Sequence, residues 1–209
     1  SMNNIIVTDT PLVKRDITIL RDKQTREEQF RSALNRIAFV LVNEISKQFT
    51  LSQFPVETPL MMTNGFTLAA PVVLVPVLRA GLSLVQPFLQ MIPDAKVGHI
   101  GLRRDEETLE PIDYYYKVPK DLDISTVILL DPMLATGGSA AASFDYLKRH
   151  GAKQLFFASL IAAPEGIERI NHEHPDVRIY TAAIDKGLNE NGFIIPGLGD
   201  AGDRTFGTL

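Results

Sequence analysis

Short runs of branched apolar residues alternate along the chain with longer segments in which apolar residues recur every three or four positions. The runs have the length and composition of strands buried on both faces, whereas the longer spacing is typical of an amphipathic helix. We predict strands at 71–78, 96–102, 127–130, 154–161 and 176–183. Strands that alternate with helices indicate an α/β protein with a mostly parallel, twisted sheet flanked by helices.

Three of the predicted helices have recognisable ends. Thr25 and Glu28 predict a capping box at the start of the first helix. The second helix follows the strand at 127–130 and ends at His150-Gly151, and the third begins at Pro164. The apolar face of the first helix consists of Phe30, Leu34, Ile37, Leu41 and Ile45.

The other segments are interpreted as an arm and a loop. Residues 2–24 mix charged and apolar side chains, which indicates an N-terminal arm with a short helix, packed on the body or on a second subunit. Residues 55–70 are irregular, with Asn64-Gly65 as the expected hairpin turn. Ser1, ahead of Met2, is expected to be a cloning remnant and takes no part in the fold prediction.

Length and composition exclude several classes of protein. The 209 residues fit a single domain, 1–209, that can bury a substantial core. The formal net charge of −4 and the pI near 5.6 argue against a nucleic-acid partner. Without cysteine there is neither a disulfide nor a thiolate zinc site, and the four histidines are too scattered for a metal cluster. No long uncharged apolar run or signal-peptide pattern is present, so we expect a cytoplasmic protein without a membrane partner.

The strand at 127–130 runs into Asp131 and then into a turn of small residues. Thr136, Gly137, Gly138 and Ser139 have so little bulk that backbone N–H groups can close around an anion, and the following helix start adds a positive dipole end. Asp131 is placed to meet hydroxyls or a hydrated metal beside a phosphate monoester, which suggests a sugar phosphate. The alternative is an ordinary connection in which the glycines only make the turn.

Two glycine-rich patterns need separate interpretation. The turn after Asp131 is not a Walker A loop, because no Gly-Lys-Ser/Thr follows the glycines. Residues 197–202 match G-x-G-x-x-G, but the chain after them is too short for the helix, second strand and acidic residue of a dinucleotide site. A glycine-rich segment can instead bring its own backbone against a flat ligand, which suits a planar base.

Arginines in two segments are candidates for anion contacts. Arg79 ends the strand at 71–78, and the small Ala80 and Gly81 after it allow backbone N–H groups to approach a pyrophosphate. Residues 103–108 form a second charged run. The alternative for both is a solvated surface segment without a ligand.

Four stretches of this sequence resemble the uracil phosphoribosyltransferases, a branch of the type I phosphoribosyltransferases. They read PVLRAG, GLRRDEETLEP, DPMLATGGS and IDKGLNENGFIIPGLGDAGDR. The resemblance implies the type I phosphoribosyltransferase fold, with a flexible β-hairpin flap at about 104–120 and a C-terminal uracil hood at about 184–204. It also implies a pentosyltransferase of pyrimidine salvage that converts uracil and 5-phosphoribosyl-1-diphosphate (PRPP) into UMP and diphosphate.

The resemblance also assigns roles to residues. The implied catalytic residues are Asp131, Asp200 and Arg104. The implied PRPP-binding residues are Arg79, Arg104, Asp131, Pro132, Met133, Leu134, Ala135, Thr136, Gly137, Gly138, Ser139 and Asp200. The implied uracil contacts, largely through backbone groups, are Ile194, Gly199, Asp200 and Ala201. Mg²⁺ is the implied cofactor, held mainly by PRPP oxygens and water with Asp200 nearby.

One position departs from most of the superfamily. Two adjacent acidic residues are usual where this chain has Asp131 followed by Pro132, so a single carboxylate remains for the ribose hydroxyls. The resemblance also implies a strained peptide near Arg79 and a homodimer or larger homo-oligomer. Some members of the family are activated by GTP. The sequence decides none of these three properties. The alternative function is a pyrimidine regulatory protein that keeps the fold and binds RNA, which the acidic charge and the hood disfavour.

Overall fold

The computed structural model describes residues 4–108 and 110–208, without the side chain of Arg104. Nine strands form the main sheet: β1 (Ile5–Val7), β4 (Val72–Leu78), β5 (Lys96–Val97), β6 (His99–Arg104), β7 (Pro111–Lys117), β8 (Thr126–Leu130), β9 (Met133–Leu134), β10 (Gln154–Ala162) and β11 (Arg178–Ile184). Their order is β1-β11-β10-β8-β4-β6-β7, with β5 beside β4 and β9 beside β10. All pairs are parallel except β6 and β7, which confirms the predicted mostly parallel sheet.

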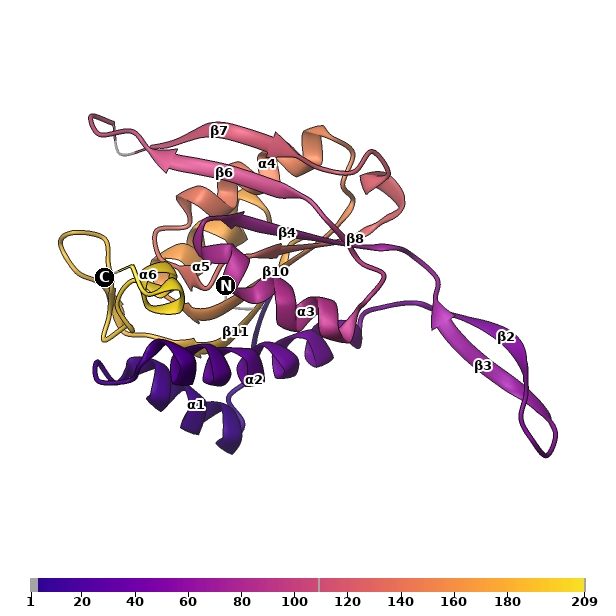
Figure 1. Ribbon diagram of the computed structural model, residues 1–209. Helices are drawn as coiled ribbons and strands as arrows, with labels where there is room; N and C mark the ends of the chain where they lie inside the picture. Colours follow the sequence, from indigo (N-terminus) through magenta and orange to yellow (C-terminus); the bar gives the residue numbers. More distant parts are fainter. Residues whose placement is uncertain (1–3, 109, 209) are drawn as a thin grey trace.

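Helices cover both faces of this sheet (Figure 1). They are α1 (Pro11–Arg21), α2 (Glu27–Ser46), α3 (Val85–Met91), α4 (Gly138–Arg149), α5 (Pro164–Glu173) and α6 (Ala201–Phe206), with 3-10 turns η1 (Ala80–Leu84) and η2 (Leu122–Ile124). Among the described residues, no helix combines the length and apolar character needed to span a membrane.

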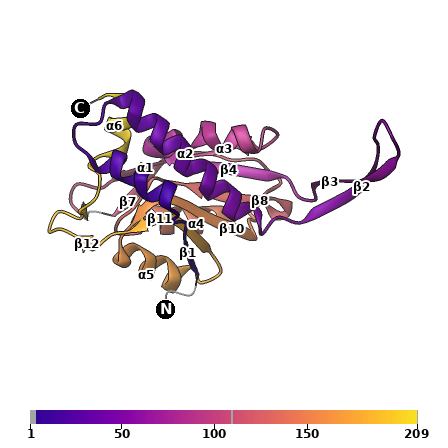
Figure 2. The same cartoon turned by 90° about the horizontal axis from the view of Figure 1, so that it is seen from below.

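Two apolar clusters lie on opposite faces of the sheet. Helices α1, α2 and α3 pack on one face, where Figure 2 shows α1 and α2 in front, and α4 and α5 pack on the other. In β8, Ile128 and Leu130 belong to the first cluster, whereas Val127 and Leu129 belong to the second. Because both sides of the strand are buried, its sequence is continuously apolar rather than alternating.

A two-stranded arm projects from the body (Figure 1). It consists of β2 (Leu51–Glu57) paired with antiparallel β3 (Met62–Leu68). The hydroxyl oxygen of Thr58 accepts hydrogen bonds from the N–H groups of Leu60 and Met61. These bonds form the turn between β2 and β3. The predicted turn at Asn64-Gly65 is wrong, because both residues lie inside β3 and the turn signal that prevails is the threonine side chain ahead of Pro59.

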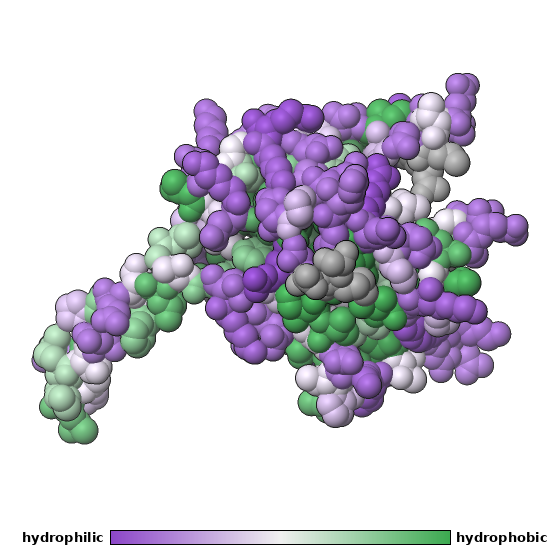
Figure 3. Space-filling model, turned by 180° about the vertical axis from the view of Figure 1, so that it is seen from behind, coloured by the Kyte–Doolittle hydropathy of each residue, from purple (hydrophilic) through white to green (hydrophobic). Residues whose placement is uncertain are grey.

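The arm carries an unusual share of exposed apolar side chains. Leu60, Met61, Met62 and Phe66 are 94%, 69%, 55% and 58% exposed. Figure 3 shows apolar and polar surface mixed along this extension. Apolar surface that extends away from the body is typical of a contact with another protein chain.

The N-terminal segment differs in two respects from its prediction. The N-terminal segment contains the predicted short helix, α1, which packs on α2. The first described residues of this segment also form β1, an edge strand beside β11. The capping box is wrong: the hydroxyl of Thr25 donates to the carbonyl of Ile19 at 2.7 Å, and α2 begins at Glu27 without a side-chain cap. Thr25 therefore closes the connection between α1 and α2 instead of starting the helix.

Candidate active site

The two central strands bring Arg79 and Asp131 to one edge of the sheet. Strands β4 and β8 are parallel neighbours, with Pro76 opposite Leu130, so the residues after them lie at the carboxyl edge, where α/β sheets bind ligands. Gly81 allows η1 to start against this edge, since a Cβ there would lie 2.4 Å from the carbonyl oxygen of Leu130. The peptide bond between Leu78 and Arg79 is cis.

Residues 131–139, called the phosphate loop below, are held against β10. Strand β9 lies within this loop and pairs with β10, and the carbonyl of Pro132 accepts a hydrogen bond of 2.9 Å from the N–H of Leu160. Gly137 has a φ of +86°, a left-handed conformation that glycine adopts without strain, and it turns the chain into α4. The amino end of α4, with its positive dipole end, therefore points into the site.

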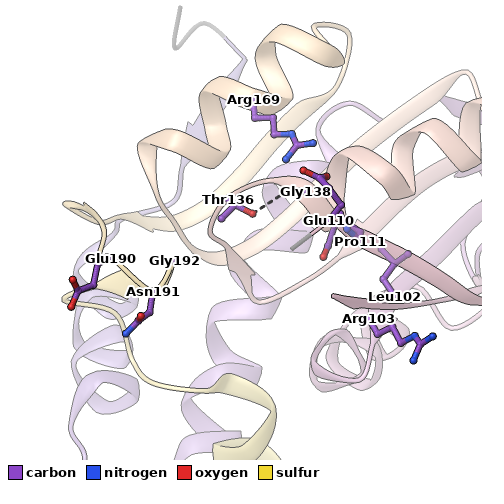
Figure 4. Close-up of a pocket in the computed structure, with 11 residues that line it drawn as sticks. Leu102, Arg103, Glu110, Pro111, Thr136, Gly138, Arg169, Glu190, Asn191 and Gly192 are labelled. Carbon is purple, nitrogen blue, oxygen red and sulfur yellow. Dashed lines mark hydrogen bonds between the residues drawn. The ribbon is translucent and has the colours of Figure 1, made fainter. Parts of the chain in front are cut away.

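Helix α5 packs directly on the phosphate loop. A Cβ on Gly166 would lie 2.6 Å from the carbonyl oxygen of Ala135, so the bare glycine lets the helix pack on the loop. Arg169, three residues later, reaches the same place: its Nη1 lies 3.3 Å from the position of a Cβ on Gly138. Its Nε donates to Glu173 at 2.9 Å, and Figure 4 shows the guanidinium directed toward the loop.

A cavity of about 540 Å³ opens beside the phosphate loop (Figure 4). The loop contributes Thr136, Gly138 and Ser139 to its lining, the β6–β7 hairpin contributes Arg103 and Pro111, and the C-terminal segment contributes Asn191. The Cγ of Pro111 lies 3.4 Å from the position of a Cβ on Gly138, so the hairpin reaches the start of α4. The volume is in the range of small-molecule sites.

Asp131 is a half-buried carboxyl group at the end of β8. Its Oδ1 accepts a weak hydrogen bond of 3.3 Å from the N–H of Met133. Burial is the larger effect and raises the pKa of Asp131 from 3.8 to about 7. Near neutral pH this group can therefore be a carboxylate that accepts hydrogen bonds from hydroxyls or an acid that donates one.

Arg79 and Asp200 both approach Gly202, the second residue of α6. A Cβ on Gly202 would lie 3.4 Å from Asp200 Oδ1 and 3.6 Å from Arg79 Nη2. Asp200 caps α6 by accepting a hydrogen bond of 2.8 Å from the N–H of Asp203. Arg79 donates to the Asp203 carboxylate at 2.8 Å, and hydrogen bonds from Thr208 and Arg79 lower the pKa of Asp203.

The hood is a short hairpin followed by a turn into α6. Its strands are β12 (Gly187–Leu188) and β13 (Ile194–Ile195), and Glu165 of α5 accepts a hydrogen bond of 2.8 Å from the N–H of Leu188. Of the four predicted base contacts, Ile194 and Ala201 are buried, whereas Gly199 and Asp200 are exposed. Gly199 has a φ of +85°. The contact with Glu165 places β12 of the hood beside α5, the helix that packs on the phosphate loop.

The structure brings most of the predicted site residues to this edge. Residues 131–139 lead into the start of α4, and Arg79 and Asp200 both lie near Gly202. The backbone of Arg104 lies in β6 of the predicted flap, but its side chain lies outside the described part of the structure, so its role stays a prediction. Sequence reasoning missed Arg169. The signal that could have found it is Gly166, because residues three apart share a helix face.

The comparisons with known proteins agree with this geometry. The family model described as uracil phosphoribosyltransferase matches residues 7–208. A uracil phosphoribosyltransferase of Dictyoglomus thermophilum is 53% identical over 205 residues, which are 98% of this chain and 99% of the relative. That of Finegoldia magna is 51% identical over 208 residues, which are 99% of this chain and all of the relative.

Two solved structures are similar to this fold, one over nearly the whole chain and one over about three quarters of it. The structure of a protein from Aquifex aeolicus has a TM-score of 0.91 and 39% identity over 97% of both chains. A purine phosphoribosyltransferase from Pyrococcus horikoshii has a TM-score of 0.53 and 18% identity over 73% of this chain and 83% of its own. The second likeness is one of fold alone, to the fold of a phosphoribosyltransferase.

Proposed function

The chain belongs to the uracil phosphoribosyltransferase family, and we propose how its site carries out the reaction of UMP salvage, in which uracil and PRPP give UMP and diphosphate. The observation that carries the proposal is the phosphate loop at the amino end of α4, next to a cavity of about 540 Å³ that is also lined by the hood. A sugar phosphate and a planar base would then meet in one place.

PRPP binding uses three groups of residues in this proposal. The 5′-phosphate lies in the phosphate loop, where backbone N–H groups and the dipole of α4 favour an anion. Asp131, in its ionised form, accepts hydrogen bonds from the ribose hydroxyls. Arg79 and Arg104 bind the diphosphate, for which the planar fork of a guanidinium is well suited.

The chemical step needs no covalent bond to the enzyme. The bond between C1 and the diphosphate oxygen breaks, the electron pair leaves with diphosphate, and positive charge develops on the ribose ring. N1 of uracil then adds to C1, and the proton on N1 passes to an oxygen of the departing diphosphate. Catalysis is therefore positioning together with stabilisation of the leaving charge. The β6–β7 flap excludes water, which would otherwise attack the ribosyl cation.

Uracil selectivity comes from main-chain groups of the hood. Along O2, N3–H and O4, uracil offers acceptor, donor and acceptor, whereas cytosine offers an acceptor at N3 and a donor at C4. Backbone groups of Ile194, Gly199 and Ala201 that fit the first pattern are left unpaired against the second. Such a mismatch in a buried site is worth roughly 10⁴-fold in specificity.

Mg²⁺ is part of the proposal as the ion that accompanies PRPP. Among the residues that the structure describes, no group of three carboxylate or histidine side chains could hold a metal by itself, whereas the exposed carboxylate of Asp200 fits an ion that keeps most of its water and substrate ligands. When bound, the ion would neutralise charge on the leaving diphosphate. Asp200 would orient that hydrated ion beside Arg79.

The proposal extends to assembly, regulation and location. The exposed apolar arm supports a homodimer or a larger homo-oligomer. A GTP effector rests on the family resemblance alone. A cytoplasmic location rests on the cysteine-free composition together with the lack of a long apolar run or a signal-peptide pattern in the sequence.

Formation of UMP from labelled uracil tests the function, with PRPP or Mg²⁺ omitted in turn and with hypoxanthine and orotate as other bases. We expect UMP only when all three components are present. If no base is used with or without GTP, while PRPP still binds, the function is a regulatory one. Salt-dependent binding of RNA would then identify the regulatory RNA-binding alternative.

A further inference from the structure

An ion pair between half-buried Arg21 and buried Asp185 joins the N-terminal helix α1 to the hood. Arg21, the last residue of α1, donates from Nη2 and Nη1 to the two carboxylate oxygens of Asp185, at 2.5 and 2.9 Å. The Asp185 side chain, just after β11, is only 2% exposed. The bidentate geometry fixes the directions of both side chains.

Both members of this pair also bind the backbone of one hood residue, Gly197, through the two peptide groups on either side of it. The N–H of Gly197 donates to Asp185 Oδ2 at 2.9 Å, and the carbonyl of Gly197 accepts from Arg21 Nη1 at 2.8 Å. Gly197 has a φ of +65°, and a Cβ on it would lie 2.2 Å from the carbonyl oxygen of Ile194. The ion pair thus holds a turn that only glycine can make.

The next peptide of the hood is fixed from the same end of α1. Arg204 donates to the carbonyl of Leu198 at 2.8 Å and to that of Asp22 at 2.6 Å, and it also donates to the carbonyl of Leu20. Two consecutive carbonyl groups of the hood therefore depend on arginines anchored at the end of α1. These contacts fix the N–H and carbonyl of Gly197 and the carbonyl of Leu198.

The position of this turn matters because it connects the base contacts on either side of it. Ile194 precedes Gly197 by three residues, and Gly199 follows it by two. A main chain distinguishes uracil from cytosine only while each N–H and C=O keeps its direction, and a rotated peptide would exchange donor for acceptor. A buried charge pair is a weak source of stability but a strong determinant of local geometry.

We propose that Arg21 and Asp185 are positioning residues of the base site, which hold the turn at Gly197 so that the hood backbone selects uracil over cytosine. This inference rests on the proposed function. The pair is expected to affect base recognition and to leave PRPP binding unchanged, because neither residue belongs to the phosphate loop or contacts Arg79.

The protein offers a matched control. Asp16 of α1 is 3% exposed and accepts hydrogen bonds of 2.9 and 3.0 Å from Arg36 of α2, but this pair has no contact with the hood among those that the structure describes. Asp185→Asn and Asp16→Asn each remove one buried carboxylate charge that faces an arginine. Both variants should therefore lose stability, and only the first should alter base recognition.

The experiment measures steady-state kinetics for uracil, cytosine and PRPP with both variants, together with thermal unfolding. For Asp185→Asn we expect the KM for uracil to rise by about tenfold or more and the preference for uracil over cytosine to narrow, with the KM for PRPP unchanged. Arg21→Lys, which keeps the charge but loses the bidentate fork, should show the same changes in weaker form.

The outcomes separate this inference from the proposed function. If the parent protein does not turn over uracil, the proposed function itself is wrong. If the parent is active and both Asp185→Asn and Arg21→Lys keep the parental KM for uracil and the parental base preference, the positioning role is wrong. Equal kinetic changes in Asp16→Asn would also overturn it, because they would show an effect of stability alone. If Asp185→Asn fails to fold, Arg21→Lys decides between the same outcomes.

Discussion

Nη1 of Arg169 lies 3.3 Å from the place that a Cβ on Gly138 would occupy, at the first turn of α4. A phosphate at this helix start would therefore meet a guanidinium as well as backbone N–H groups. Charge-assisted hydrogen bonds of this kind are about twice as strong as neutral ones. The proposed phosphate site therefore includes a side chain of α5, a helix in which the sequence showed no binding motif. Arg169 can approach because Gly138 has no side chain.

Gly138→Val is expected to weaken PRPP binding. The new side chain would meet Arg169 and, at 3.4 Å, the ring of Pro111, and it would crowd the phosphate. We expect the KM for PRPP to rise by about tenfold or more, which corresponds to about 1.4 kcal/mol of binding free energy. Ala142→Val, in the same helix and away from the cavity lining, controls for the helix propensity of valine. An unchanged PRPP affinity would count against the phosphate loop.

Arg169→Met should also raise the KM for PRPP while the KM for uracil stays at its parental value. A hydrogen bond to a charged group contributes about 1.5–3 kcal/mol, which predicts a change of about tenfold to a hundredfold. Arg149→Met removes an exposed arginine of α4 and is the matched control. Isothermal titration measures the affinity of each variant for PRPP. Equal affinities of the two variants would contradict the assignment of Arg169.

Asp131 predicts a pH dependence of stability. Burial raises its pKa in the folded protein to about 7, whereas the unfolded carboxyl group titrates near 3.8. Between these values the folded state binds more protons than the unfolded state, so this group makes the free energy of unfolding fall as pH rises from about 4 to about 7. Asp131→Asn should gain stability relative to the parent by about 1 kcal/mol or more between pH 4 and pH 8.

Denaturant unfolding at several pH values measures this difference. The exposed Asp123→Asn is the control, for which the difference from the parent should not change in the same way. A stability difference between Asp131→Asn and the parent that is independent of pH would show that Asp131 is not desolvated in the folded protein.

Asp200→Asn is expected to lower turnover far more than stability. Asparagine is as good a helix cap as aspartate, so α6 should keep its start, while the negative charge beside Arg79 is lost. We expect kcat to fall by roughly tenfold or more, as for other groups that stabilise developing charge. Full activity at saturating PRPP and Mg²⁺ would remove the role of Asp200, whatever the thermal unfolding temperature.

Much of the sheet could be predicted because its strands are buried on both faces. The continuous apolar runs that became β4 and β8 have few alternatives, and each is followed by the residues that now lie at the carboxyl edge. The turn from β8 into α4 was predictable for a similar reason, since small residues between a strand and a helix are typical of such a connection. Its role as an anion site stays a prediction.

Other features depend on contacts between distant segments. The hairpin turn was misplaced because Asn64-Gly65 is a strong local signal, whereas the turn that formed depends on the Thr58 side chain. The pairing of Arg79 with Asp203 and the approach of Arg169 to Gly138 join segments far apart in sequence. No periodicity or motif encodes such contacts, which arise only once helices pack on the sheet.

The most direct test of the account is the ratio of kcat/KM for uracil to that for cytosine, measured with saturating PRPP and Mg²⁺. A hood that reads the base with its backbone predicts a ratio of roughly 10⁴. Cytosine turnover within about tenfold of uracil turnover would contradict the assignment of the hood, since a missing or reversed hydrogen bond in a buried site costs more than that.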